Sequence, residues 1–260
     1  MAEKRGQATV FFLLAFVVFT AFSFLIYVKV SNIEKIVAEK DSVSNDISFA
    51  EPVKNYVQGC LENVAENSIG VVGIQGGYYD SPEQSYSSFL FSYSYHFDGI
   101  RNVMPTKKKI EEEIAKGVVE ELPYCLSNFS ALKERGINID EGPIRAASTI
   151  TGAGVAIDVA YPLKIRQGAK SEVAANFKTH IPVRLSAIYD TSKRINDMQE
   201  ADPENVCLSC IIDDARSKDL NVLIFSYRDG DTFFEIIDNQ SKLMNEPYSF
   251  IFGAKNEPIQ

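Results

Sequence analysis

The sequence has few of the residues, and none of the local motifs, by which enzymes are usually recognised. Its only histidines are His96 and His180, and each is expected on the polar face of a strand. No H-E-x-x-H zinc motif and no G-x-S-x-G nucleophile motif occurs in the 260 residues. We therefore expect no catalytic residues, no metal site and no cofactor, and predict that the protein is not an enzyme.

Positive charge is also scarce. The chain has 26 basic and 35 acidic residues, for a net charge of −9. The one dense basic run, at 107–109, is followed at once by three glutamates at 111–113, which is typical of a solvated helix face. Because binding to phosphate needs a basic surface, we expect no nucleic acid as a partner.

A glycine-rich stretch, GIQGG at 73–77, follows a predicted helix and is followed by two tyrosines. It lacks the Lys-Ser/Thr of a Walker A loop and does not follow a strand, as a dinucleotide-binding loop would. The pattern therefore favours a turn with positive φ angles, onto which the tyrosines pack.

What the chain does have is a long apolar run near its N-terminus. Residues 8–28 contain no charge, no proline and no glycine. About twenty such residues in a helix cross the hydrocarbon core of a bilayer. Lys4 and Arg5 precede the run, so the positive-inside rule places the N-terminus in the cytoplasm and everything after Lys29 outside. A cleavable secretory signal is disfavoured because the run is too long; a plain signal anchor stays open.

The junction Lys4-Arg5-Gly6-Gln7 resembles the class III, or prepilin-type, leader of archaeal type IV pilin-like proteins. The resemblance implies that a leader peptidase cuts between Gly6 and Gln7 and that the apolar helix is kept. Phe11 stands where bacterial type IV pilins usually carry glutamate, which disfavours the bacterial type.

The whole chain also resembles a family of uncharacterised archaeal membrane-anchored proteins. The shared stretches are RGQATVFF, VKNYVQGCLENV followed by GIQGGYY, AYPLKI and EPYSFIFGAKN. We expect a leader at 1–6, a transmembrane or pilin-like helix at 7–28, a stem or linker at 29–50 and an extracytoplasmic α+β domain at 51–260. That domain could form two packed subdomains with a boundary near 140–150.

Four cysteines would lie outside the cytoplasm, where thiols tend to be oxidised. Of the three possible pairings we favour Cys60–Cys125 together with Cys207–Cys210. The C-x-x-C spacing leaves two alternatives open, half of a zinc site or a redox pair. A thioredoxin-type pair needs a strand–CxxC–helix context, whereas residues 202–205 are loop-like.

Hydrophobic periodicity predicts an α+β fold, in which the long N-terminal helix is followed by a mainly antiparallel sheet with packed helices. Pro52 begins a helix with one apolar face, formed by Val53, Val57, Cys60, Leu61, Val64, Ala65, Ser68, Ile69 and Val72. The other expected elements are helices at 106–121 and 182–200, strands at 89–97 and 248–252, and hairpins at 155–177 and 221–238. Pro162 suggests a bulge or an edge position in the first hairpin.

Asn128 and Asn239 each begin an N-x-S sequence and are candidate glycosylation sites. Taken together, the pattern predicts a single-pass, extracytoplasmic, type IV pilin-like protein with a structural or adhesive role at the cell surface, and self-assembly through the N-terminal helix. The alternative is a signal-anchored ectodomain that binds a ligand or an envelope component without forming filaments.

Overall fold

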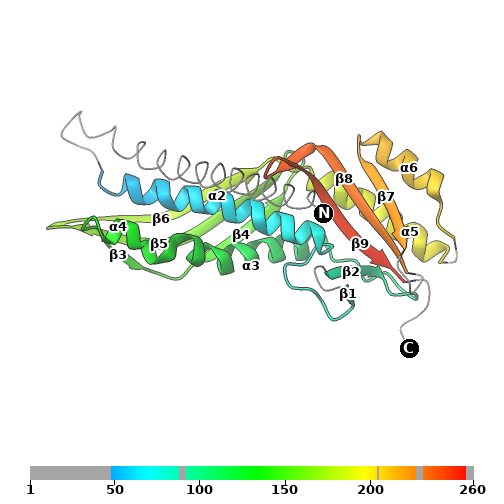
Figure 1. The fold of residues 1–260 in the computed structure, drawn as a ribbon, viewed down its shortest axis with the longest axis horizontal. Coiled ribbons are helices and arrows are strands. Elements are labelled where there is room, and N and C mark those ends of the chain that lie inside the picture. The colour runs from blue at the N-terminus through cyan, green and yellow to red at the C-terminus, as the bar shows by residue number, and fades with distance from the viewer. Residues whose placement is uncertain (1–47, 88–91, 204, 227–230, 256–260) are drawn as a thin grey trace, which may run out of the picture. The chain divides into compact units, whose positions relative to one another are not determined.

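The computed structural model describes residues 48–87, 92–203, 205–226 and 231–255 (Figure 1). The chain divides into two units, Met1–Ser48 and Phe49–Gln260, and every element below belongs to the second. The predicted leader site at Gly6 and Gln7, the apolar helix at 7–28 and nearly all of the stem at 29–50 lie outside the described residues. In the part that is described, no helix is long and apolar enough to cross a membrane.

Helices and strands are mixed, and most strand pairs are antiparallel, which confirms the α+β class of the folded unit. The helices are α2 (Glu51–Ile74), α3 (Lys107–Leu126), η1 (Ser127–Phe129), α4 (Ser130–Lys133), α5 (Leu185–Ala201) and α6 (Leu208–Ser217). The strands are β1 (Ser85–Ser87), β2 (Ser92–Phe97), β3 (Asn138–Glu141), β4 (Arg145–Ile150), β5 (Val155–Gln167), β6 (Lys170–Ile181), β7 (Asn221–Ser226), β8 (Thr232–Leu243) and β9 (Glu246–Ala254).

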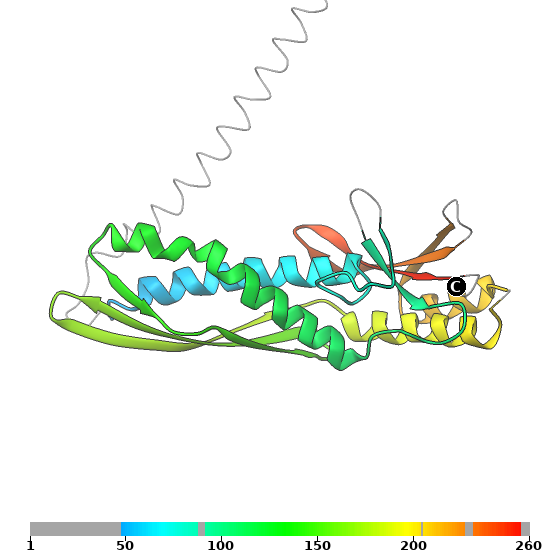
Figure 2. The ribbon, with the colours of Figure 1, turned by 90° about the horizontal axis from the view of Figure 1, so that it is seen from below.

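The first sheet is built around β5, the long strand in its middle. β6 pairs along one edge of β5, while β3 and β4 pair with different stretches of the other edge, all antiparallel. Helices α2 and α3 run antiparallel to each other and pack on this sheet (Figure 2). The 155–177 hairpin is therefore confirmed and extends to Ile181.

Pro162 lies at a β-bulge, one of the two positions that the sequence allowed. The β5–β6 register shifts between Ala160 and Leu163, because β5 has one more residue there than β6. Along β5 every odd residue from Val155 to Ile165 is buried. On β6 the buried positions therefore change parity, from Ala174 on one side of the bulge to Phe177 and Ile181 on the other, and Val173 is 68 % exposed.

The second sheet has the strand order β1-β2-β9-β8-β7. Its pairs are antiparallel except β2–β9, which is parallel and joins two segments far apart in the sequence. Helix α5 packs against β2, β8 and β9, and α6 packs against β7. These contacts place α5 and α6 at the other end of the unit from the β5–β6 turn (Figure 1).

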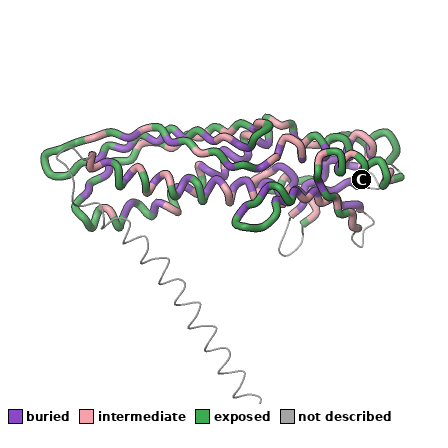
Figure 3. The backbone as a smooth tube through the Cα atoms, turned by 90° about the horizontal axis from the view of Figure 1, so that it is seen from above, coloured by how far each residue is buried: buried purple, intermediate pink, exposed green. Residues whose placement is uncertain are grey.

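One hydrophobic core runs through both sheets, so Phe49–Gln260 forms a single compact unit (Figure 3). All nine residues predicted for the apolar face of α2 are buried in it. This face meets α3, β6 and β9, so α2 serves both sheets. The subdomain boundary expected near 140–150 stays a prediction.

Candidate functional site

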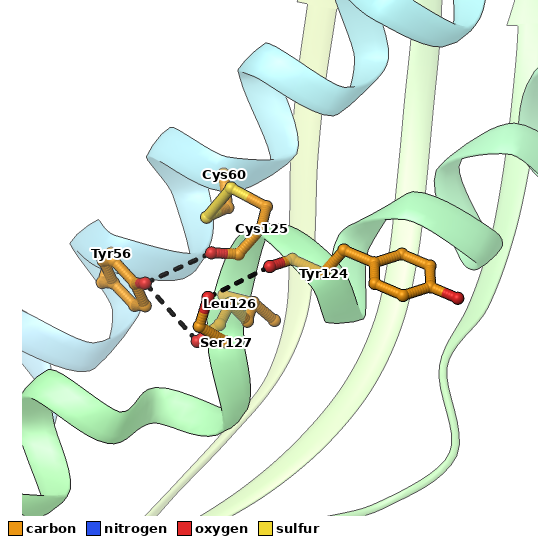
Figure 4. The surroundings of a disulfide bond; sticks show 6 residues. All are labelled: Tyr56, Cys60, Tyr124, Cys125, Leu126 and Ser127. Atoms are coloured by element: carbon orange, nitrogen blue, oxygen red, sulfur yellow. Dashed lines mark hydrogen bonds between the residues drawn. A yellow bond between two sulfur atoms is a disulfide. The ribbon is translucent and has the colours of Figure 1, made fainter.

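The first disulfide joins α2 to the last turn of α3. Cys60 lies on the buried face of α2, and its Cα atom is 5.7 Å from that of Cys125. Next to this bond the Tyr56 hydroxyl donates to the carbonyl oxygens of Cys125, at 3.3 Å, and Leu126, at 3.4 Å (Figure 4). The pairing is the one that the sequence favoured, and the bond acts as a clamp, which here means a covalent link between two packed helices.

The candidate glycosylation residues lie in different settings. Asn128 is exposed, in a tight turn where residues 127–129 all have positive φ. Asn239 is exposed on β8, but Ser241 of the same N-x-S sequence is fully buried and hydrogen-bonded. Glycosylation at both stays a prediction.

The second disulfide, Cys207–Cys210, lies at the beginning of α6, with Cα atoms 5.3 Å apart. Cys207 is the N-cap residue of the helix and is half-buried, whereas Cys210 is exposed. The motif is thus preceded by a loop, as predicted, but itself forms the first turn of a helix. Among the described residues no group of three or more histidine, cysteine and carboxylate side chains could hold a metal ion.

The glycine-rich stretch at 73–77 forms a closed turn at the end of α2. Gly76 and Gly77 have φ angles of +66° and +102°, and a Cβ atom on Gly76 would lie 2.7 Å from the carbonyl oxygen of Ile251. Tyr79 packs back onto α3: its N–H donates to Glu113 at 2.9 Å and its hydroxyl to Glu121 at 2.8 Å. The stretch therefore forms the kind of turn that the sequence favoured, with positive φ angles at two glycines and a tyrosine packed beside it.

His96 is one of the buried ionisable groups of the second sheet. It was expected on the polar face of a half-buried strand, but both faces of β2 are covered and His96 has no exposed surface. Its Nε2 lies 2.8 Å from the Gly76 carbonyl oxygen and its Nδ1 3.3 Å from the Ser192 hydroxyl. The ring stacks on Phe252, with centroids 4.3 Å apart. His180 is exposed on β6, in the other sheet, so the two histidines do not share a site.

Burial lowers the pKa of His96 to about 4, and the hydrogen bond to the Gly76 carbonyl only partly opposes this. In the unfolded chain the pKa of histidine is about 6.5, so between these pH values the unfolded state binds more protons. We predict that the free energy of unfolding is highest above about pH 6.5 and falls by about 3 kcal/mol as the pH drops toward 4. Urea unfolding of the full chain in detergent, followed by circular dichroism at several pH values, measures this.

Two variants assign the effect to His96. His96→Gln keeps a donor for the Gly76 carbonyl but does not titrate. Most of the loss of about 3 kcal/mol between pH 6.5 and 4 should therefore disappear in this variant. His180→Gln, at an exposed position, should leave the pH dependence unchanged. An equal response of the two variants would show that burial of His96 does not govern the acid sensitivity.

A buried ion pair gave no signal in the sequence. Asp238 has no exposed surface and accepts hydrogen bonds from Arg184 Nε at 2.9 Å, from the backbone N–H of Gln240 at 3.0 Å and from the Ser241 hydroxyl. Arg184 also donates to the carbonyl oxygen of Lys218 at 3.0 Å. The cluster therefore ties together α5, the turn after α6 and β8. Arg184 lies at the start of the helix predicted at 182–200 and Asp238 at the end of a predicted strand, and nothing in either local pattern relates them.

Comparisons with protein-family models, with curated proteins and with solved structures give no match. The functional argument therefore depends on the residues of this chain alone.

Proposed function

We propose that the protein is a membrane-anchored, extracytoplasmic, non-enzymatic protein of the type IV pilin-like kind, with a structural or adhesive role at the cell surface. The observation that carries the proposal is the uncharged run at 8–28 placed directly after Lys4-Arg5-Gly6-Gln7. The run has the length of a bilayer span, and the basic pair before it fixes its direction.

The disulfides support an extracytoplasmic location for the folded unit. All four cysteines are paired, one pair as a clamp between two helices. Structural disulfides form and persist in oxidising compartments and are rare in the cytosol. The folded unit would therefore be the part that faces the outside of the cell.

The mechanism is physical. The helix from Gln7 to Tyr27 anchors the chain in the bilayer. Once residues 1–6 are removed, the same helix could leave the membrane and bundle with copies of itself, since no interior charge opposes either environment. The folded unit would then form the exposed surface of the filament.

The N-terminal sequence and the intact mass of the protein from its native membrane test the proposal. A mature chain that begins at Gln7 is expected, and Gly6→Val should keep the leader attached. A wild-type chain that begins at Met1 or Ala2 would contradict prepilin-type processing and leave a plain anchored ectodomain.

Assembly needs a separate experiment. Membranes are sheared without detergent and the released material is sedimented. Filaments should appear as long polymers from the wild type and be absent from Gly6→Val. If the processed wild type releases no polymers, the alternative function is favoured: an anchored ectodomain that binds an envelope component.

A further inference from the structure

The two disulfides differ in what they do for the fold. Cys60–Cys125 joins two helices across 65 residues, and Cys60 is only 6 % exposed. Cys207–Cys210 spans three residues within one helical turn and joins no two elements. Because a short closed loop restricts the unfolded chain least, this second bond contributes less to stability. Its exposed position suggests another role.

Cys207 lies at the N-terminus of α6, and this position stabilises its thiolate. The first N–H groups of a helix lack partners within the helix, and no described side chain caps α6. A thiolate at the N-cap position is stabilised by these groups and by the helix dipole. The Ser209 hydroxyl lies 3.8 Å from Cys207 Sγ and can donate to it. Cys207 is therefore the better leaving group of the pair.

Two carboxylates of α6, Asp213 and Asp214, would oppose a thiolate, but each has a cationic partner. Asp214, one turn further along α6, accepts from Lys218 Nζ at 2.6 Å and from the Thr191 hydroxyl at 3.0 Å. Asp213 lies 3.7 Å from Arg216. The helix dipole therefore acts on Cys207 without an unpaired negative charge among these neighbours.

Apolar side chains are exposed next to the disulfide. Leu208 and Ile212 lie one turn apart on α6 and are 54 % and 46 % exposed, and Leu223 of β7 is 52 % exposed. A hollow of about 660 Å³ between α6 and β7 is lined by apolar side chains, among them Ile212 and Leu223, and by polar ones, among them Arg216 and Asp219. Leu208 itself lies within the C-x-x-C motif, so a polypeptide that brings its own cysteine to the disulfide meets an exposed apolar side chain there.

We propose that Cys207–Cys210 is a redox-active disulfide that oxidises pairs of cysteine thiols in another polypeptide. A substrate thiolate attacks the exposed Cys210 Sγ, the Sγ–Sγ bond breaks, and Cys207 leaves as a thiolate. The second substrate thiolate then attacks its own sulfur in the mixed disulfide and releases Cys210 as a thiolate. The substrate loses two electrons and gains a disulfide, and Cys207 and Cys210 become the reduced dithiol. The reaction is stoichiometric, since this chain ends as the dithiol, so it adds to the proposed non-enzymatic role. It depends neither on the membrane anchor nor on filament assembly.

Equilibration of the full chain, in detergent, with mixtures of reduced and oxidised glutathione tests the proposal. Alkylation and peptide mapping then count the thiols at each cysteine pair. The matched control is an oxidised peptide spanning residues 205–213, which has the same disulfide without the folded helix. We expect the folded protein to be about tenfold more oxidising than the peptide, because only the helix stabilises the Cys207 thiolate. Equal constants for protein and peptide would overturn the proposal.

Oxidation of a leucine-flanked dithiol peptide tests the substrate class. One peptide disulfide should form for each Cys207–Cys210 pair reduced, and none with the Cys207→Ala/Cys210→Ala variant, whose circular dichroism reports whether it folds. Ile212→Glu should slow the reaction with the peptide several-fold but not the reaction with glutathione. Val173→Glu, at a site on β6 that is 68 % exposed and belongs to the other sheet, should slow neither. Reduction of Cys207–Cys210 only when the protein unfolds would show that the bond is purely structural.

Discussion

Replacement of Asp238 by alanine is expected to lower the free energy of unfolding by about 3–5 kcal/mol. The carboxylate is fully buried and bound by Arg184, Ser241 and the N–H of Gln240. Its removal leaves a guanidinium with much of its surface covered and without its counter-ion, and two further donors without their acceptor. The loss of stability comes from these donors, which stay buried without an acceptor. The intact ion pair itself stabilises the fold little more than a pair of apolar side chains would.

The pKa of Asp238 indicates which form is present. Burial raises it, but hydrogen bonds from Arg184, Ser241 and Gln240 outweigh burial, so the pKa lies below the usual value. The carboxylate is therefore charged at neutral pH, and its contribution is lost only as the pH falls below about 3.8. This range lies below the window from pH 6.5 to 4 in which His96 acts, so the two effects separate in a pH series.

Urea unfolding at pH 7, followed by circular dichroism, measures the Asp238 effect. The matched control is Asp197→Ala, which breaks the exposed Lys193–Asp197 pair and should cost less than about 1 kcal/mol. Arg184→Met combined with Asp238→Leu should recover much of the loss, because neither charge is then left alone. A similar cost for Asp197→Ala and Asp238→Ala would mean that burial of the pair has no energetic consequence.

The local sequence pattern was sufficient to predict the buried residues wherever a segment packs along one regular face. All nine residues assigned to the buried face of α2 are buried, because a single stripe at helical spacing meets α3, β6 and β9. The two hairpins were predictable for a similar reason: strand alternation on both sides of a polar turn leaves little choice of partner. The parallel β2–β9 pair joins distant segments, and no local pattern reports it.

Elsewhere, tertiary contacts overrode the local pattern. The lysines of α3 precede its glutamates, which disfavours the helix by its dipole. The glutamates nevertheless have partners outside the helix, since Glu111 accepts from the N–H of Ile150, and Glu113 and Glu121 accept from Tyr79. His96 looked like a surface residue because the alternation on β2 continued through it. Packing of α5 on that face was not visible in the strand itself.

Conversion of Cys60 and Cys125 to alanine together is expected to cost about 4 kcal/mol of stability. The bond closes a loop of 65 residues, and its loss releases the chain entropy of the unfolded state. For a domain of this size the melting temperature should fall by about 10 °C. Thermal unfolding of the full chain in detergent, followed by circular dichroism, measures both quantities.

The second disulfide provides the matched control. Cys207→Ala/Cys210→Ala removes a bond that closes a much shorter loop, so it should cost no more than about 2 kcal/mol. Tyr56→Phe removes the hydroxyl that hydrogen-bonds to the end of α3 and leaves the disulfide intact. We expect the free energy of unfolding to fall by about 1 kcal/mol, which separates the contribution of this hydrogen bond from that of the disulfide. If both double variants lost the same amount, loop length would not set the contribution of either bond. The contrast between a structural clamp and a redox-active pair would then lose its thermodynamic basis.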